Sequence, residues 1–331
     1  MAAHAYLTVF TGTTQGVYKV DVGLGTVTRI ANLAAPRGLC VTPDELYAYV
    51  AGVSSAVQKI DTTTGATLVT IATPLPAFEL DISFDGAYVY ALCPGGPLYV
   101  IATATDTIVA TISAAALSAV PDCFYPTTAP DGNHVYVVGA LPSGGSFNVA
   151  IIDVGTWAVS GGIALPATTN PGFLSNMGVS ADSTLGYVVQ PNASNTGPIC
   201  TVLDLVANTV VTTIALTPAT APNTGYYTTC NYENSAVYCA LSSSTSGDGR
   251  VSLVDPISNT ETLSVPGFQN TQSTALNPTE EFLLAANATG TFAVRLDTAS
   301  FGVGYIGSLT GQSQTVAFPK GRGGQHVVML T

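Results

Sequence analysis

Apolar and polar residues alternate in short stretches along this chain, and each stretch ends in a turn. Residues 59–71, KIDTTTGATLVTI, show the unit clearly: an alternating run ends in an acid, a Thr-rich turn with a glycine follows, and a second alternating run leads away. A period of two residues is typical of a strand with one buried face. The pattern therefore predicts a β-hairpin with a carboxylate at its rim.

Nearly the same unit returns along the whole chain, and its seven copies begin at residues 19, 59, 100, 151, 202, 253 and 295. Between copies lies a second unit, a Pro-Asp-Gly-like turn followed by an aromatic-rich strand, as in TPDELYAYVAG at 42–52 and APDGNHVYVVG at 129–139. In one copy Ala102 stands where the others have an acid, and the acids are Asp21, Asp61, Asp153, Asp204, Asp255 and Asp297.

Together the two units predict four short strands per repeat of about 40 to 50 residues, which is the size of a β-propeller blade. Four such strands cannot enclose a core alone, so neighbouring blades must bury each other's faces. The sequence therefore predicts an all-β, seven-bladed β-propeller with four antiparallel strands per blade, formed as a single domain by residues 1–331. N- and C-terminal strands are expected to share one blade and so close the ring.

The phrases at 42–52, 59–71 and 129–139 resemble the repeats of YVTN-type (YncE-like) β-propellers, and the resemblance covers essentially the whole chain. The resemblance implies the propeller fold. It does not single out one activity, because that family includes binding proteins, surface-layer and secreted proteins, and some enzymes. Repeats of the WD type are not indicated, since the only tryptophan, Trp157, lies in no Trp-Asp pair.

The recurring aspartates are interpreted as residues that stabilise the turns. A carboxylate at the end of the third strand of a blade can accept hydrogen bonds from the backbone N–H groups of the turn that follows. A catalytic acid is needed once, whereas this residue occurs in six of the seven copies. The Pro-Asp-Gly-like turns are likewise expected to close the first hairpin of each blade.

The termini offer five candidate strands for one four-stranded blade. The C-terminal candidates are SQTVAF at 313–318 and HVVML at 326–330, and the N-terminal ones are AYLTVF at 5–10, GVYKVDV at 16–22 and TVTRI at 26–30. Two interpretations stay open for the spare terminal strand. It packs on an edge or frays, or it pairs with the sheet edge of another subunit and makes a homo-oligomer.

Composition narrows the possible partners. The chain has 8 Lys and Arg against 20 Asp and Glu, a net charge of −12, and 47% apolar residues. Nucleic acids and anionic membranes are disfavoured because a basic face cannot form, and no apolar run reaches the length of a membrane helix. The uncharged polar surface favours an extracellular or cell-surface location. The first ten residues do not resemble a signal peptide, so a cytoplasmic location stays open.

Candidate chemistry lies where the first strands of the blades reach the mouth of the central channel. Arg37, Glu79 and Asp81 stand out there because charge is so rare, and they are the candidate catalytic residues. An ion pair that joins two blades is the alternative interpretation of these three residues. Aligning the first strands on their turns gives the full set of candidate ligand-binding residues: Arg37, Glu79, Asp81, Tyr125, Asn176, Tyr227 and Gln314.

No cofactor is expected. A Ca²⁺ site from Glu79, Asp81 and Asn176 is conceivable because all three carry oxygen ligands, but the sequence has no D-x-D-x-D-type loop. The three histidines are scattered and predict neither a catalytic triad nor a zinc site. Cys230 and Cys239 flank one turn on adjacent strands and are a candidate disulfide, with buried free thiols as the alternative.

The sequence thus favours a propeller that acts as a binding or assembly module. Its contacts are expected at the channel mouth or through a terminal strand, with a protein, a glycan or a small molecule as the ligand. The alternative is a propeller enzyme, such as a lyase, hydrolase or cyclising enzyme, that acts on a small molecule at the same mouth. Repeats without a catalytic signature favour the binding module.

Overall fold

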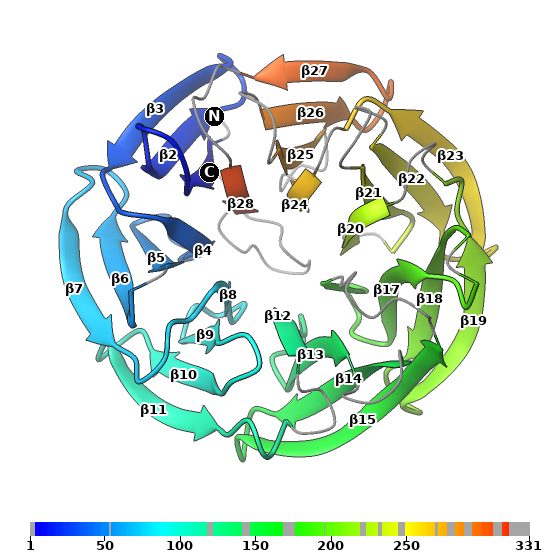
Figure 1. Cartoon of the computed structure of the whole chain (residues 1–331), viewed down its shortest axis with the longest axis horizontal. Coiled ribbons are helices and arrows are strands. Elements are labelled where there is room, and N and C mark those ends of the chain that lie inside the picture. The colour runs from blue at the N-terminus through cyan, green and yellow to red at the C-terminus, as the bar shows by residue number, and fades with distance from the viewer. Residues whose placement is uncertain are drawn as a thin grey trace.

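The computed structural model describes residues 4–52, 54–117, 122–140, 146–167, 176–194, 196–218, 223–230, 234–243, 249–268, 271–276, 282–287, 293–306 and 313–317. These residues form seven sheets of four antiparallel strands, arranged as a ring (Figure 1). The predicted all-β, seven-bladed propeller is confirmed. The described part of the chain contains no helix, and hence none that could cross a membrane.

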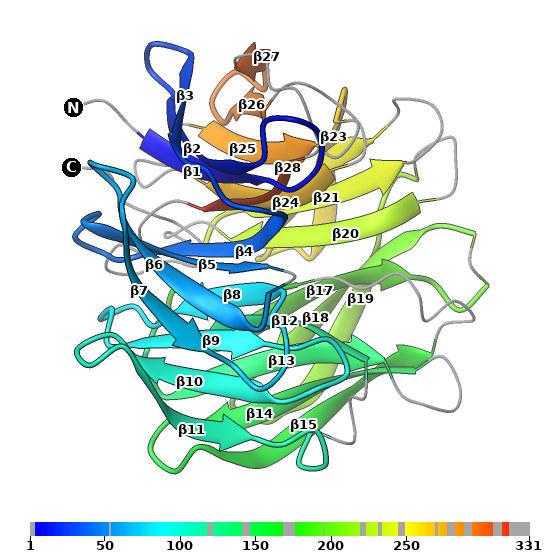
Figure 2. The same ribbon diagram turned by 60° about the vertical axis from the view of Figure 1, so that its left-hand side comes forward.

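Six of the blades run from the channel to the rim in chain order, and the seventh has the order β28-β1-β2-β3 (Figures 1 and 2). The strands next to the channel are β4 (Pro36–Val41), β8 (Glu79–Ile82), β12 (Asp122–Thr128), β16 (Met177–Val179), β20 (Asn223–Cys230), β24 (Thr271–Leu276) and β28 (Ser313–Ala317). The second strands are β5 (Tyr47–Gly52), β9 (Tyr88–Leu92), β13 (His134–Ala140), β17 (Leu185–Pro191), β21 (Val237–Ser243), β25 (Phe282–Asn287) and β1 (His4–Val9).

The third strands carry the repeated acid at their ends and are β6 (Ala56–Asp61), β10 (Leu98–Ala102), β14 (Ser146–Asp153), β18 (Pro198–Asp204), β22 (Arg250–Asp255), β26 (Ala293–Asp297) and β2 (Gly16–Asp21). The rim strands are β7 (Thr67–Ala72), β11 (Thr107–Ile112), β15 (Ala158–Ala167), β19 (Thr209–Ala215), β23 (Thr260–Pro266), β27 (Val303–Ile306) and β3 (Thr26–Ala31). We number the blades 1 to 6 from β4 onward and call the sheet β28-β1-β2-β3 the closing blade.

The closing blade joins the two ends of the chain, as predicted. Its innermost strand, β28, pairs with β1, so a C-terminal strand completes a sheet of three N-terminal ones. The other C-terminal candidate strand, 326–330, lies outside the described residues, and the hypothesis of a spare strand stays a prediction. In this blade Ala317 faces Tyr6, and the register is irregular between the pairs Leu7–Val316 and Val9–Ser313.

The repeated acids cap the turns, which confirms their structural interpretation. In blade 1 the Asp61 carboxylate accepts hydrogen bonds from the backbone N–H groups of Thr63 and Thr64, at 2.9 and 2.7 Å. Asp204 and Asp297 accept equivalent pairs. These bonds favour the ionised carboxylate, and they lower the pKa of Asp61. The predicted first-hairpin turns also form, since the Glu45 N–H donates to the Thr42 carbonyl oxygen at 2.9 Å.

The core lies between blades rather than within them. One cluster combines Tyr49 and Val57 of blade 1 with Leu80, Val89 and other residues of blade 2, and the clusters that follow around the ring are built in the same way. Every blade therefore depends on its neighbours to exclude water from its faces. Five of the largest fully buried side chains are the tyrosines of the second strands: Tyr6, Tyr49, Tyr90, Tyr136 and Tyr187.

A second recurring feature was not predicted: the fourth residue after each acid position has a left-handed backbone. Its side chain can reach the preceding blade. Asp106 of blade 2 binds Lys59 of blade 1, and Trp157 of blade 3 packs edge-on against Tyr88 of blade 2, with ring centroids 5.0 Å apart. The residues at this position are Gly25, Gly65, Asp106, Trp157, Asn208, Asn259 and Phe301, with φ between 53° and 72°.

Candidate functional site

The channel mouth on the side where the first strands begin is the candidate site. Arg37 is the second residue of β4, Phe78 precedes β8, and Phe10 follows β1. The Gly38 N–H donates to the Phe78 carbonyl oxygen at 2.7 Å, which holds β4 against β8. A Cβ on Gly38 would lie 2.5 Å from the same oxygen, so only glycine allows this approach. The close approach brings Arg37 and Phe78 together.

The Arg37 guanidinium contacts two aromatic rings. Its central carbon lies 4.4 Å from the centroid of the Phe78 ring and 5.1 Å from that of Phe10. Ring faces attract a cation because of their quadrupole. No acid of the described residues lies within 4.0 Å of this guanidinium, and its Nε is buried without a hydrogen-bond partner. Arg37 and Glu79 therefore form no direct ion pair within 4.0 Å, although the charge of Arg37 acts on Glu79.

Glu79 begins β8 directly after Phe78 and is half-buried beside the channel. Burial raises the pKa of Glu79 to about 8, although the positive charge of Arg37 acts in the opposite direction. At neutral pH the group is therefore mostly a neutral carboxylic acid, which can donate a hydrogen bond as well as accept one. The mouth thus combines a cation held by rings with an acid that titrates near neutral pH.

Asp81 lies two residues deeper and is buried, with 1% of its surface exposed. Its Oδ2 accepts hydrogen bonds from the backbone N–H and the hydroxyl of Thr128, at 2.8 and 3.0 Å, and so joins β8 to β12. Asn176 does the same between blades 4 and 5. Its amide donates to the Thr228 carbonyl oxygen at 3.0 Å and accepts from the Thr228 N–H at 2.7 Å. Both side chains link neighbouring blades.

These contacts bear on the conceivable Ca²⁺ site. The Asn176 amide oxygen and Asp81 Oδ2 both accept hydrogen bonds from the next blade. No group of three or more His, Cys, Asp or Glu residues within the described ranges is arranged to hold a metal ion. Such groups do not include a set that contains Asn176, so a Ca²⁺ site made by Glu79, Asp81 and Asn176 stays a prediction.

The remaining candidates divide into two groups. Tyr125 of β12 is half-buried and packs against a cluster of blades 5 and 6 that includes Leu276 and Leu283. Tyr227 and Gln314 belong to β20 and β28, next to the channel as expected, but their side chains lie outside the described part. Their predicted roles as ligand contacts stay predictions.

The sequence missed Phe10 as a partner of Arg37. The only signal in the sequence was that Phe10 ends an N-terminal strand. That strand lies beside β4 only because the N- and C-terminal strands close the ring. A second contact at this closure is the Thr8 hydroxyl, which donates to the Arg37 carbonyl oxygen at 2.7 Å. The closing blade therefore contacts Arg37 in two places: the Phe10 ring packs on the guanidinium, and the Thr8 hydroxyl binds the backbone carbonyl oxygen.

The candidate disulfide between Cys230 and Cys239 is wrong, because both thiols are free and buried. Cys230 faces Val237, and Cys239 faces Thr228, so the two cysteines are diagonal rather than opposite neighbours. The Cys239 thiol is instead hydrogen-bonded with Cys200 of blade 4, and burial contributes to raising its pKa well above the usual range. The alternative of buried free thiols is confirmed for the five cysteines whose side chains are described.

Replacing Asp81 by alanine is expected to lower the free energy of unfolding by about 2 to 4 kcal/mol, because the buried Thr128 N–H and hydroxyl both lose their acceptor. Asp81→Asn keeps an oxygen at this place and should cost less than half as much. Urea unfolding followed by circular dichroism measures both. A loss below 1 kcal/mol for Asp81→Ala would show that the contact does not stabilise the ring.

Fold and mouth together define a seven-bladed β-propeller with an arginine and a titratable acid at one end of its channel. No protein-family model and no curated protein matches the chain. Among solved structures, hydrazine synthase of Kuenenia stuttgartiensis is similar, with a TM-score of 0.72 and 20% identity over 86% of this chain and 89% of that one.

Two further solved structures have the same fold. A protein of unknown function from Desulfotomaculum acetoxidans has a TM-score of 0.75 and 14% identity, over 97% of this chain and 100% of that one. A protein from Bacteroides uniformis, provisionally described as a 6-phosphogluconolactonase, has a TM-score of 0.72 and 14% identity, over 95% of this chain and 98% of that one. Identities this low show the fold alone.

Proposed function

We propose that this chain is a YVTN-type (YncE-like) propeller that works as an extracellular or cell-surface binding module, with its ligand at the channel mouth. The observation that carries the proposal is the Arg37 cation, which is held by the rings of Phe10 and Phe78 and is ion-paired to no acid of the described residues. A guanidinium held in this way offers N–H donors to an incoming anion.

The ligand class follows from the neighbouring acid. Guanidinium groups bind carboxylates and phosphates, and a neutral carboxylic acid at Glu79 donates a hydrogen bond to an uncharged oxygen. A molecule that carries a carboxylate beside hydroxyl groups, such as a uronic acid unit of a glycan, meets both requirements. The net charge of −12 repels anions in general, so such binding requires the local positive charge of Arg37.

Isothermal titration calorimetry with glucuronate and with glucose as its uncharged counterpart tests this proposal. The wild-type chain is expected to bind glucuronate more tightly than glucose, and Arg37→Gln should abolish that preference. Arg29→Gln, on the exposed rim strand β3, is the matched control and should bind as the wild type does. Equal binding of the two sugars, or binding that Arg37→Gln leaves intact, would overturn the assignment of the mouth.

An enzyme that uses the same mouth is the second candidate, because a carboxyl group with a pKa of about 8 can give or take a proton near neutral pH. The similarity to a protein provisionally described as a 6-phosphogluconolactonase makes a sugar lactone the first substrate class to assay. Lactone hydrolysis that is lost in Glu79→Gln would favour the enzyme. Hydrolysis no faster than in buffer would favour the binding module.

A further inference from the structure

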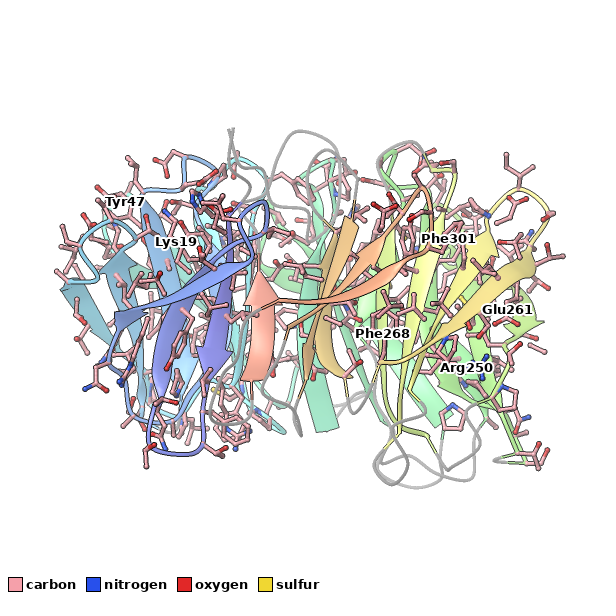
Figure 3. The ribbon with its side chains drawn as sticks, turned by 90° about the horizontal axis from the view of Figure 1, so that it is seen from above. Lys19, Tyr47, Arg250, Glu261, Phe268 and Phe301 are labelled. Carbon is pink, nitrogen blue, oxygen red and sulfur yellow. The ribbon has the colours of Figure 1, made fainter. Side chains whose placement is uncertain are left out.

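A polar cleft lies between the closing blade and blade 1, near the turns that follow the third strands. We call it the closing cleft. It has a volume of about 370 Å³ and is lined by His4, Lys19, Asp21, Thr26, Thr28, Ile30, Thr62 and Thr63. Lys19 and the blade 1 residue Tyr47 lie toward the same face of the disc (Figure 3). The cleft is distinct from the channel mouth, because its residues belong to the start of β1, to the outer strands β2 and β3, and to the turn after β6.

The interface between blades 1 and 2 shows which group lies beside the lysine that corresponds to Lys19. Lys59 of β6 corresponds to Lys19 of β2, since each pairs with the buried tyrosine of its second strand. Asp106 of blade 2 lies against Lys59, with a distance of 2.9 Å between Nζ and Oδ2, and it also accepts a hydrogen bond from the Tyr49 hydroxyl at 2.6 Å. A carboxylate therefore neutralises the lysine at that interface.

Position 65 of the closing interface supplies no such carboxylate, for a steric reason. The residue that corresponds to Asp106 is Gly65, and a Cβ built on it would lie 1.8 Å from the backbone oxygen of Ile30. Real Cβ atoms do not approach an oxygen so closely, so no acidic side chain fits at position 65 while β3 stays in place. At the equivalent of His4, blade 1 has Tyr47, whose ring lies 4.5 Å from Lys59 Nζ.

The acids near Lys19 have other contacts. Asp21 accepts a hydrogen bond from the Leu24 N–H at 2.9 Å, and its other oxygen lies 3.9 Å from His4 Nε2. Glu45 lies close enough to the buried Tyr6 hydroxyl to contribute to the raised pKa of that group. Within the described ranges, neither acid lies within 4.0 Å of Lys19 Nζ. Lys19 is thus a cation beside a cleft large enough for a small molecule.

We propose that the closing cleft binds a small molecule through a carboxylate, which lies beside Lys19 as Asp106 lies beside Lys59. The four lining threonines offer hydroxyl groups as further hydrogen-bond partners. Asp21 favours a ligand whose carboxylate is accompanied by an ammonium group, as in a free amino acid, because the cleft then receives no net charge.

The chain allows a direct test, because it contains three lysines, Lys19, Lys59 and Lys320. Lysine labelled with carbon-13 next to Nζ gives one NMR signal for each, and Lys19→Arg and Lys59→Arg assign them. Titration with acetate and with glycine, at constant ionic strength, is expected to shift the Lys19 signal in a saturable way. Glycine should saturate at the lower concentration. The Lys59 signal should stay in place.

Acetamide, which has the shape of acetate without its charge, is the control ligand and should cause no saturable shift. Thr28→Trp fills the cleft from the exposed strand β3 while it keeps Lys19, and it should abolish the shift. A Lys19 shift that rises linearly, or that persists in Thr28→Trp, would show non-specific ion binding and overturn the proposal. Arg37→Gln should leave the Lys19 shift unchanged, so failure of the channel-mouth proposal can be distinguished from failure of the closing-cleft proposal.

Discussion

Raising the pH from 5 to 9 is expected to lower the free energy of unfolding by roughly 2 to 4 kcal/mol through the single carboxyl group of Glu79. Burial raises its pKa from 4.5 to about 8. Between these values the folded chain holds a proton that the unfolded chain has released. Stability therefore falls as pH rises through this window, and the full loss is present above pH 8.

Glu79→Gln isolates this contribution, because glutamine keeps the shape of the side chain and cannot ionise. The variant should match the wild type at pH 5 and exceed it in stability at pH 9. Other groups affect both proteins equally: burial lowers the pKa of His4 and raises that of Cys93 to about 11. Denaturant unfolding at one-unit pH steps gives the two curves. Parallel curves would show that Glu79 is ionised in the folded chain.

The second large effect concerns the interface between blades 1 and 2, where Asp106→Asn is expected to cost about 3 kcal/mol of stability. The exposed fractions of Lys59 and Asp106 are 12% and 16%, so the remaining lysine would be a mostly buried cation without a counter-charge. Asparagine suits the left-handed backbone at this position, as Asn208 and Asn259 show in other blades. The loss would therefore come from the charge and not from the backbone.

A double-mutant cycle with Lys59→Met tests this cause. The double variant should lose less stability than the sum of the two single variants, with a coupling of more than about 1 kcal/mol, because removing both charges leaves none unpaired. The coupling should persist in high salt, since buried pairs are weakly screened. Additive effects of the two substitutions would show that the ion pair contributes nothing to the contact between the blades.

The sequence predicted the ring and the turns because both depend on residues close together in the chain. Asp61 caps a turn made by the residues directly after it, so each copy of the unit forms its turn without contacts from distant parts of the chain. The number of copies of the unit, seven, then sets the number of blades. The site was predicted in part: Arg37 and Glu79 lie at the mouth, whereas Asp81 and Asn176 turned out to join neighbouring blades.

The pattern of the sequence by itself thus determined the seven blades, their four strands and the capping role of the aspartates, since hydrogen bonds within a turn need no distant partner. Tertiary structure alone decided what the rare charges contact. Phe10 meets Arg37 only because the ring closes, Asp106 meets Lys59 only across an interface, and Gly65 leaves Lys19 beside an open cleft. Such contacts depend on the packing of one blade against the next, which no single repeat encodes.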